Sequence, residues 1–363
     1  MTGAVLHDKG HTSKGHTRMP TLAQTYRAIF LRRMFWISVL AAAVVVSLVL
    51  NIGTGPSGMS IERIVAGLFF PGSLDPSQRV ILWDVRMPFA ALAIVVGACL
   101  GLAGAEMQTV LNNPLASPST LGVMHAATVG ASLAIVFHLD TFGISENYVI
   151  PVFAFAGAMA SIFMIHFLSR TFGATVDTVI LFGIATVFAM DATVSLIQFM
   201  ANDDSLQQIV FWTMGSVARA TWEKVAIVSA VFAVCLPFSL RHMWQMTALR
   251  GGEDQARSFG VGVDRLRTLV LIRVSLLTAI AISFTGVIGF VGLVGPHIAR
   301  LAFGEDHRFY LPGSALAGAF ILSGASLIAK TLVPGILIPD GIVTALIGIP
   351  LFLALVITQK RRA

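Results

Sequence analysis

Residues 10–17 have the glycine spacing of a phosphate-binding loop, a motif that would give this chain nucleotide chemistry. Such a loop needs a lysine for the terminal phosphates and a preceding strand, whereas His16 stands at the lysine position and no strand pattern precedes it. His7, His11 and His16 could also bind a metal ion weakly. We expect instead a disordered basic tail over residues 1–33, with neither a nucleotide site nor a metal site.

A second charged segment, residues 242–264, could act on a partner. Gly252 precedes Glu253 and Asp254, which places two acids in the first turn of a short helix, where the helix dipole favours them. The Phe-Gly-Val run at 259–261 is typical of a helix end. The sequence predicts a short amphipathic helix, which is either a solvated linker or a lever that docks on another subunit.

A few polar residues interrupt otherwise apolar helices. Gln108 and Asn112 lie near one end of an apolar run, where such groups usually face protein or a water-filled path. Asp191 lies inside another apolar run, and it either faces a cavity or a partner, or is a neutral, hydrogen-bonded structural residue at a broken helix. Glu106 is expected near the inner membrane interface.

The composition identifies the kind of protein that must position these residues. Hydrophobic residues make up 56% of the 363 residues and charged residues only 12%, and the mean hydropathy is +0.84. A soluble domain carries roughly a quarter charged residues, so this is a polytopic membrane protein. The net charge of +6 indicates no nucleic-acid partner, because the basic residues gather at the ends of apolar runs. Cys99 and Cys235 lie within apolar runs and provide no disulfide framework.

Apolar runs of about 20 residues are long enough to cross a bilayer core of roughly 30 Å. Such runs lie at 35–52, 88–110, 120–138, 148–168, 175–200, 224–240, 311–330 and 341–358. The remaining run, 266–302, would form a helix of roughly 55 Å, so we divide it into two spans. The predicted fold is an all-α membrane domain over 34–358 with about ten transmembrane helices, followed by a short tail at 359–363.

The second part of the divided run is rich in glycine. Gly286, Gly289, Gly292 and Gly295 recur every third residue and would give a helix a strip without side chains for close helix contact. Pro296 is expected to interrupt this helix.

Basic residues predict the topology. Both termini carry clusters of Lys and Arg, and the positive-inside rule places both in the cytoplasm. Two cytoplasmic termini require an even number of spans, which supports the division of 266–302. The inner loops then hold most other basic residues, Arg250 and Arg273 among them, whereas Arg86 falls in the first outer loop and Lys330 at an outer helix end.

The run from Gly289 to Arg300 resembles the signature of the FecCD family, the permeases of ABC importers for iron-siderophore, heme and cobalamin substrates. Further motifs of this family occur in the right order between about residues 55 and 357. They are Arg86-Met87-Pro88, Asn113-Pro114-Leu115-Ala116-Ser117-Pro118, Trp212-Thr213-Met214-Gly215-Ser216, Gly304-Glu305-Asp306-His307-Arg308 and Pro339-Asp340-Gly341.

The resemblance implies a type II ABC importer permease fold in a bacterial inner membrane. The partners implied are a second permease chain, two ATP-binding subunits that carry ATP and Mg, and a periplasmic substrate-binding protein. The implied substrate is a ferric siderophore-like chelate, and the chain itself would be neither an enzyme nor a cofactor carrier. The residues implied to couple to the ATPase are Gly252, Glu253, Asp254, Ala256, Arg257 and Gly260. Arg86 and Lys330 would dock the binding protein. Residues of the translocation path or its packing would be Gln108, Asn112, Asn113, Pro114, Gly292, Pro296 and His297.

The chain departs from the family pattern at several positions, and two alternatives stay open. Phe89 replaces a second arginine, Ser326 and Lys330 replace an Asp and an Arg, and Asp340 replaces an apolar residue. Heme or cobalamin would suit the same family. An ion-coupled secondary transporter acting through Asp191 and Glu106 is the competing class, although such folds usually show inverted repeats that we do not find here.

Overall fold

The computed structural model describes residues 22–55, 58–138, 145–172 and 176–360, and within these ranges every regular element is a helix. Among the described residues, seven helical segments are long and apolar enough to cross a membrane, and three shorter apolar helices accompany them, at Val123–Val136, Val291–Phe303 and Asp340–Ala354. The prediction of an all-α fold with about ten transmembrane helices is confirmed.

The ten apolar helices follow the predicted order, and several extend beyond the predicted ends. They are α1 (Leu22–Gly53), α4 (Met87–Val110), α5 (Val123–Val136), α6 (Glu146–Phe172), α7 (Val176–Met200), α9 (Trp222–Arg241), α12 (Val263–Thr285), α13 (Val291–Phe303), α14 (His307–Thr331) and α15 (Asp340–Lys360). The short elements between them are α2 (Ile61–Phe69), η1 (Pro71–Ser73), α3 (Pro76–Val80), η2 (Ile81–Arg86), η3 (Pro118–Leu121), α8 (Asp203–Thr213), α10 (Met243–Leu249) and α11 (Glu253–Ser258).

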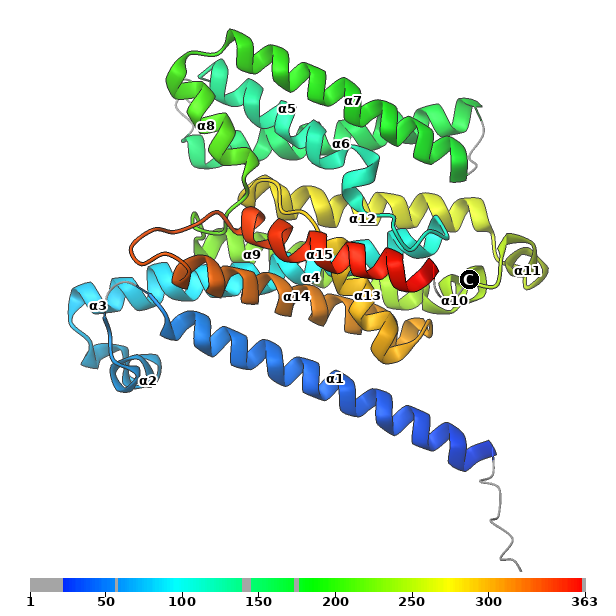
Figure 1. The fold of residues 1–363 in the computed structure, drawn as a ribbon, viewed down its shortest axis with the longest axis horizontal. Helices are drawn as coiled ribbons and strands as arrows, with labels where there is room; N and C mark the ends of the chain where they lie inside the picture. Colours follow the sequence, from blue (N-terminus) through cyan, green and yellow to red (C-terminus); the bar gives the residue numbers. More distant parts are fainter. Residues whose placement is uncertain (1–21, 56–57, 139–144, 173–175, 361–363) are drawn as a thin grey trace, which may run out of the picture.

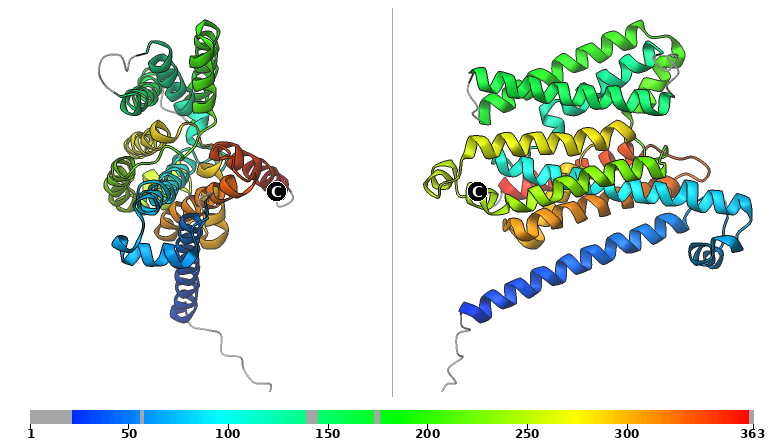
Figure 2. Two further views of the ribbon diagram at one scale, coloured as in Figure 1. Left: turned by 90° about the vertical axis from the view of Figure 1, so that its left-hand side faces the viewer. Right: turned by 180° about the vertical axis from the view of Figure 1, so that it is seen from behind.

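The helices α5, α6 and α7 form a layer beyond α12, and α1 leans across the opposite side of the bundle (Figure 1). The central helix α4 packs against α14, α12 and α13. The start of α1 and the last turn of α15 lie toward the same end as α10 and α11, here called the α11 end (Figure 2). The opposite end carries α2, α8 and the connection from α14 to α15, and is called the α8 end.

Glycines on α4 allow its backbone to contact the backbones of the neighbouring helices directly. A Cβ atom on Gly97 would come within 2.4 Å of the Gly318 carbonyl oxygen, and one on Gly104 within 1.8 Å of the Gly292 carbonyl oxygen. At Gly101 it would come within 2.2 Å of the carbonyl oxygen of Ser314. This helix therefore has a contact face of small residues, which meets α14 and α13.

The division of 266–302 into two helices is confirmed, but the glycine strip is not as predicted. The helix α12 ends at Thr285 and α13 begins at Val291, so Gly286 and Gly289 lie in the connection between them. Pro296 does not interrupt α13, which continues to Phe303. A proline cannot donate to the carbonyl four residues earlier, and that carbonyl, of Gly292, is the one that meets Gly104. The hydrogen bond that Pro296 cannot make is therefore missing at the point where the backbones of α13 and α4 touch.

Two further expectations need correction. The helix α1 begins at Leu22, so residues 22–33 of the predicted disordered tail are helical, while His7, His11 and His16 lie outside the described residues. Arg273 is not in a loop but inside α12, where its side chain is buried.

Candidate functional site

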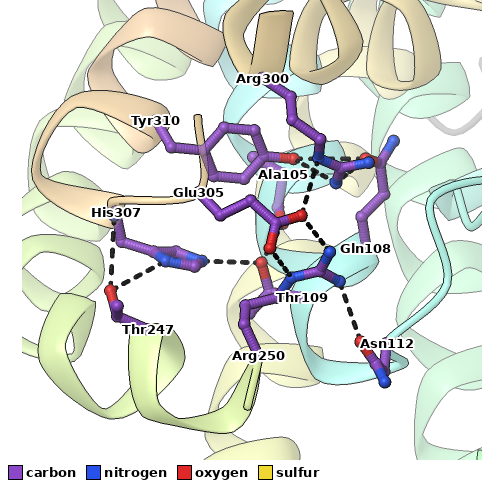
Figure 3. Close-up of polar contacts among 10 residues, drawn as sticks. All are labelled: Ala105, Gln108, Thr109, Asn112, Thr247, Arg250, Arg300, Glu305, His307 and Tyr310. Atoms are coloured by element: carbon purple, nitrogen blue, oxygen red, sulfur yellow. Dashed lines mark hydrogen bonds and ion pairs between the residues drawn. The ribbon is translucent and has the colours of Figure 1, made fainter. Parts of the chain in front are cut away.

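A polar network at the α11 end joins three stretches that are far apart in sequence, residues 105–112, 247–250 and 300–310 (Figure 3). Its centre is Arg250, which caps the end of α10 just before α11. The Arg250 Nε atom donates to the Glu305 carboxylate at 3.1 Å, and its Nη2 atom makes a second, parallel contact with the same group. The Arg250 Nη1 atom donates to Asn112 Oδ1 at 2.9 Å. One guanidinium therefore links the segment before α11 to the α13–α14 connection and to the end of α4.

A second arginine extends this network toward α13 and α14. Arg300 donates from Nη2 to Gln108 Oε1 at 3.0 Å and to the Tyr310 hydroxyl at 3.1 Å. That hydroxyl in turn donates to Gln108 Oε1 at 3.3 Å. Arg300 Nε also lies 3.5 Å from the Glu305 carboxylate. Gln108 is fully buried on α4, and its hydrogen bonds join α4 to α13 and α14. These bonds explain why a polar residue stands in this apolar helix.

The fully buried His307 forms the third branch, between α4 and α10. Its Nε2 atom lies 2.8 Å from Thr109 Oγ1, and its Nδ1 atom lies 3.0 Å from Thr247 Oγ1. Each hydroxyl also donates to the carbonyl four residues earlier in its own helix. The imidazole therefore bridges two helices whose own backbones fix the bridging hydroxyls.

The acids in this network are ionised at neutral pH. Burial alone would raise the pKa of Glu305, but the hydrogen bond and charge of Arg250, together with the charge of Arg300, hold it below its ordinary value. The hydrogen bond from Arg308 lowers the pKa of Asp306. Asp306 also accepts from Arg33 Nη1 at 2.9 Å, which attaches α1 to the same region.

The short helix predicted in 242–264 is confirmed as α11. Gly252 precedes it with a φ of 108°, a conformation that suits glycine, and both acids lie in its first turn. After the helix, Gly260 has a φ of 79° and the Val261 amide donates to the Ala256 carbonyl at 3.0 Å, which is the glycine-terminated helix end that the sequence indicates.

Comparison with known proteins identifies the family of the chain that contains this network. The FecCD transport family matches residues 43–358. This chain belongs to the FecCD transport family. Its relatives include MJ0087 of Methanocaldococcus jannaschii, named as an ABC transporter permease protein, which is 35% identical over 94% of this chain and 99% of the relative. The hemin transport system permease protein HmuU of Yersinia pestis is 32% identical over 87% of this chain and 94% of the relative.

A solved structure supports the same fold. It is a transporter assigned to the metal-chelate type of ABC transporter, in an inward-facing conformation, and it superposes with a TM-score of 0.77 at 31% identity. The alignment covers 89% of this chain and 98% of the solved chain. The chain is therefore a multi-pass membrane protein with the fold of a type II ABC importer permease.

Within this FecCD permease, the residues expected to couple to an ATPase divide into exposed and enclosed groups. Asp254 and Arg257 are exposed on α11, and Glu253 is partly exposed while it pairs with Arg267 and, at 3.5 Å, with Arg257. Ala256 is fully buried against its own chain, so it presents no surface to a partner in this conformation, contrary to expectation. Phe259 is 57% exposed and was not predicted, because the sequence indicated only a helix end there.

The two residues expected to dock a binding protein hold α1 instead of displaying their charges. Arg86 does not lie in a loop but ends η2, and its buried side chain donates from Nη1 to the Ile52 carbonyl at 3.0 Å. Lys330 donates from Nζ to Asn51 Oδ1 at 2.9 Å. Docking through either residue would require it to leave these contacts.

Each departure from the family pattern has a partner within the chain. Phe89 presents its ring 3.7 Å from the Lys330 ammonium, so a cation–π contact stands where the family has arginines. Ser326 donates to Asn51 Oδ1 at 3.4 Å. Asp340 Oδ2 accepts from the Val217 amide at 2.8 Å.

The residues assigned to the translocation path lie at several places in the fold. Gln108 and Asn112 join the polar network, and Gly292 packs against Gly104. Asn113 Oδ1 accepts from the Leu115 amide at 2.9 Å, which fixes the turn that contains Pro114. Pro296 is buried and His297 is half-buried on α13. Their role in a path stays a prediction.

One buried ion pair was missed. Arg273 on α12 donates to both carboxylate oxygens of Glu106 on α4, from Nε at 2.8 Å and from Nη2 at 2.6 Å. Each of these two charged residues stands alone within an apolar run. An isolated charge of this kind indicates a partner of opposite sign, so the sequence held a signal for this pair. Asp191 is 3.6 Å from His125 Nε2 and its side chain is 56% exposed, so it faces a partner side chain, and the helix that carries it, α7, is not broken.

Proposed function

We propose that this chain is the transmembrane permease subunit of a binding-protein-dependent ABC importer that carries a ferric siderophore-like chelate across a bacterial inner membrane. The observation that carries this proposal is the polar network at the α11 end of a FecCD permease. Through it, a displacement of the α10–α11 segment would reach α4, α13 and α14 by direct side-chain contacts.

The proposed sequence of events begins at α11. A separate ATP-binding subunit contacts its exposed residues, and its ATP-driven closure moves the segment. Arg250 is the rigid link, because one planar guanidinium contacts both Glu305 and Asn112. His307 moves with it through Thr247. The helices then tilt and change which end of the path is open, and this chain itself carries out no hydrolysis.

The proposed orientation places the α11 end and both termini in the cytoplasm. The basic residues of this end include Arg250, Arg257, Arg265 and Arg308, as the positive-inside rule requires of a cytoplasmic face. The α8 end then faces the periplasm, where the binding protein delivers substrate. A second permease chain and two ATP-binding subunits complete the transporter.

The substrate class is supported by the names of the relatives. They include permeases for hemin, molybdate, cobalamin and ferric citrate. Three of these four substrates are metal chelates of an organic ligand, and the related solved structure is of the metal-chelate type. We favour an iron chelate among these substrates.

An uptake experiment tests this choice. The complete transporter is reconstituted in proteoliposomes with ATP inside, and the binding protein is loaded in turn with a ferric chelate, hemin, cobalamin or molybdate. We expect accumulation of the ferric chelate above the other three. If only hemin, cobalamin or molybdate accumulated, the proposed substrate would be wrong, although the assignment to the ABC importers would still hold.

A further inference from the structure

A cavity of about 560 Å³ lies at the α8 end, enclosed by the starts of α6 and α9, by α8, and by the connections after α12 and α14. This volume lies in the range of sites for small organic molecules. Its walls include the apolar and aromatic residues Phe211, Trp212, Phe284 and Leu337. Such walls suit the organic body of a ligand.

One cation faces this cavity without an internal partner. Arg219 lines the cavity and is exposed, and no hydrogen bond or ion pair engages its guanidinium within the described ranges. The other cation in the wall, Lys224, is buried and donates from Nζ to the Arg219 carbonyl at 2.7 Å. The carboxylate of Glu146, also in the wall, accepts from the Gln208 amide at 3.3 Å.

The loop that carries Arg219 is fixed from several sides. The Ser216 amide donates to the Thr285 carbonyl at 2.6 Å. The Val217 amide donates to Asp340 at 2.8 Å, and the Gly341 amide donates to the Gly215 carbonyl at 3.0 Å. These three bonds, together with the bond from Lys224 Nζ to the Arg219 carbonyl, hold residues 215–219 against α9, α12 and α15. The backbone that carries Arg219 therefore needs no reordering when its guanidinium binds an anion, which favours affinity.

We propose that this cavity is a binding site for a metal chelate with an organic body and at least one free oxyanion, and that Arg219 binds the oxyanion. The ligand's body packs on the aromatic wall while the guanidinium donates to the anionic group. Asp340 is a positioning residue, because its carboxylate holds the loop two residues before Arg219. The assignment to transport rests on the proposed function, since that function places the cavity at the periplasmic mouth.

Binding to the full chain in lipid nanodiscs tests the site without ATP or partner subunits. The probes are a trianionic ferric tricatecholate and a neutral ferric trihydroxamate of similar size. We expect the natural chain to prefer the anionic probe, and Arg219→Gln to reduce that preference by about tenfold, the effect of losing one charge-assisted hydrogen bond. Arg219→Lys should retain part of it, and Asp340→Asn should lower it through the loop.

The control is Arg79→Gln, which removes another exposed arginine of the same end outside the cavity. It should leave the preference unchanged. Equal binding of the two probes by the natural chain, or an equal effect of the two glutamine variants, would overturn the site. Failure of the proposed function is distinct, because it appears as absent ATP-driven uptake, whatever the binding results are.

Discussion

The contact between Arg250 and Glu305 is predicted to transmit motion from α11 to the membrane helices, and Glu305→Gln tests it. This change keeps the size of the side chain and removes its charge. A charge-assisted hydrogen bond contributes about 1.5–3 kcal/mol when buried. The Glu305 side chain is 44% exposed, so solvent screening reduces the contribution of this bidentate ion pair to about 1–2 kcal/mol. This corresponds to a factor of roughly 5–30 in the equilibrium that couples the two elements.

The assay measures ATP hydrolysed and substrate accumulated in the same proteoliposomes. We expect Glu305→Gln to lower substrate moved per ATP by about fivefold or more, while membrane insertion and basal hydrolysis stay near normal. A charge swap, Arg250→Glu with Glu305→Arg, should restore part of the coupling, whereas Asp75→Asn at the α8 end serves as the control. Normal coupling in Glu305→Gln would refute the role of this contact.

Three further changes test other parts of the structure, and the ionisation of Glu305 adds a pH dependence. Because its folded pKa is lowered, coupling should be constant above the ordinary value of 4.5 and be lost only as the pH falls through the folded pKa. Gly104→Ala should separate α4 from α13 and lower the melting temperature of the purified protein, whereas Gly53→Ala, where a Cβ meets open space, should not. Glu106→Gln should destabilise the protein by about 3–5 kcal/mol, because it leaves Arg273 buried without a counter-charge, and Glu106→Leu with Arg273→Met should recover most of the loss in the same thermal measurement. Reporter fusions after Gly10 and after Lys360 should both indicate the cytoplasm, and one outside signal would contradict the topology.

The sequence predicted the membrane helices well because each rests on a local property, a run of apolar residues of sufficient length. The same locality made α11 predictable, since Gly252 and Gly260 mark its ends. The connection at 286–290 was not predicted. Glycines spaced by three suit a helix face, but Gly286 and Phe290 adopt positive φ values that only the tertiary packing selects.

The partners of charged residues could not be predicted because they join distant segments. Arg250 and Glu305 are 55 positions apart, and Glu106 and Arg273 are 167 apart. Arg86 and Lys330 show the opposite error. Their family role suggested exposed charges, whereas the structure uses both to hold the end of α1. Exposure of a side chain depends on the helix packed against it, which the local sequence does not encode.

We propose that ATP hydrolysis by a separate subunit, and not an ion gradient, drives chelate movement through this chain, and an uptake measurement separates these two driving forces. Proteoliposomes containing the complete transporter receive radioactive ferric chelate on the loaded binding protein, with either ATP inside or an imposed proton or sodium gradient. We expect accumulation with ATP alone, and no change when the gradient is collapsed. Accumulation that follows the ion gradient and ignores ATP would contradict it.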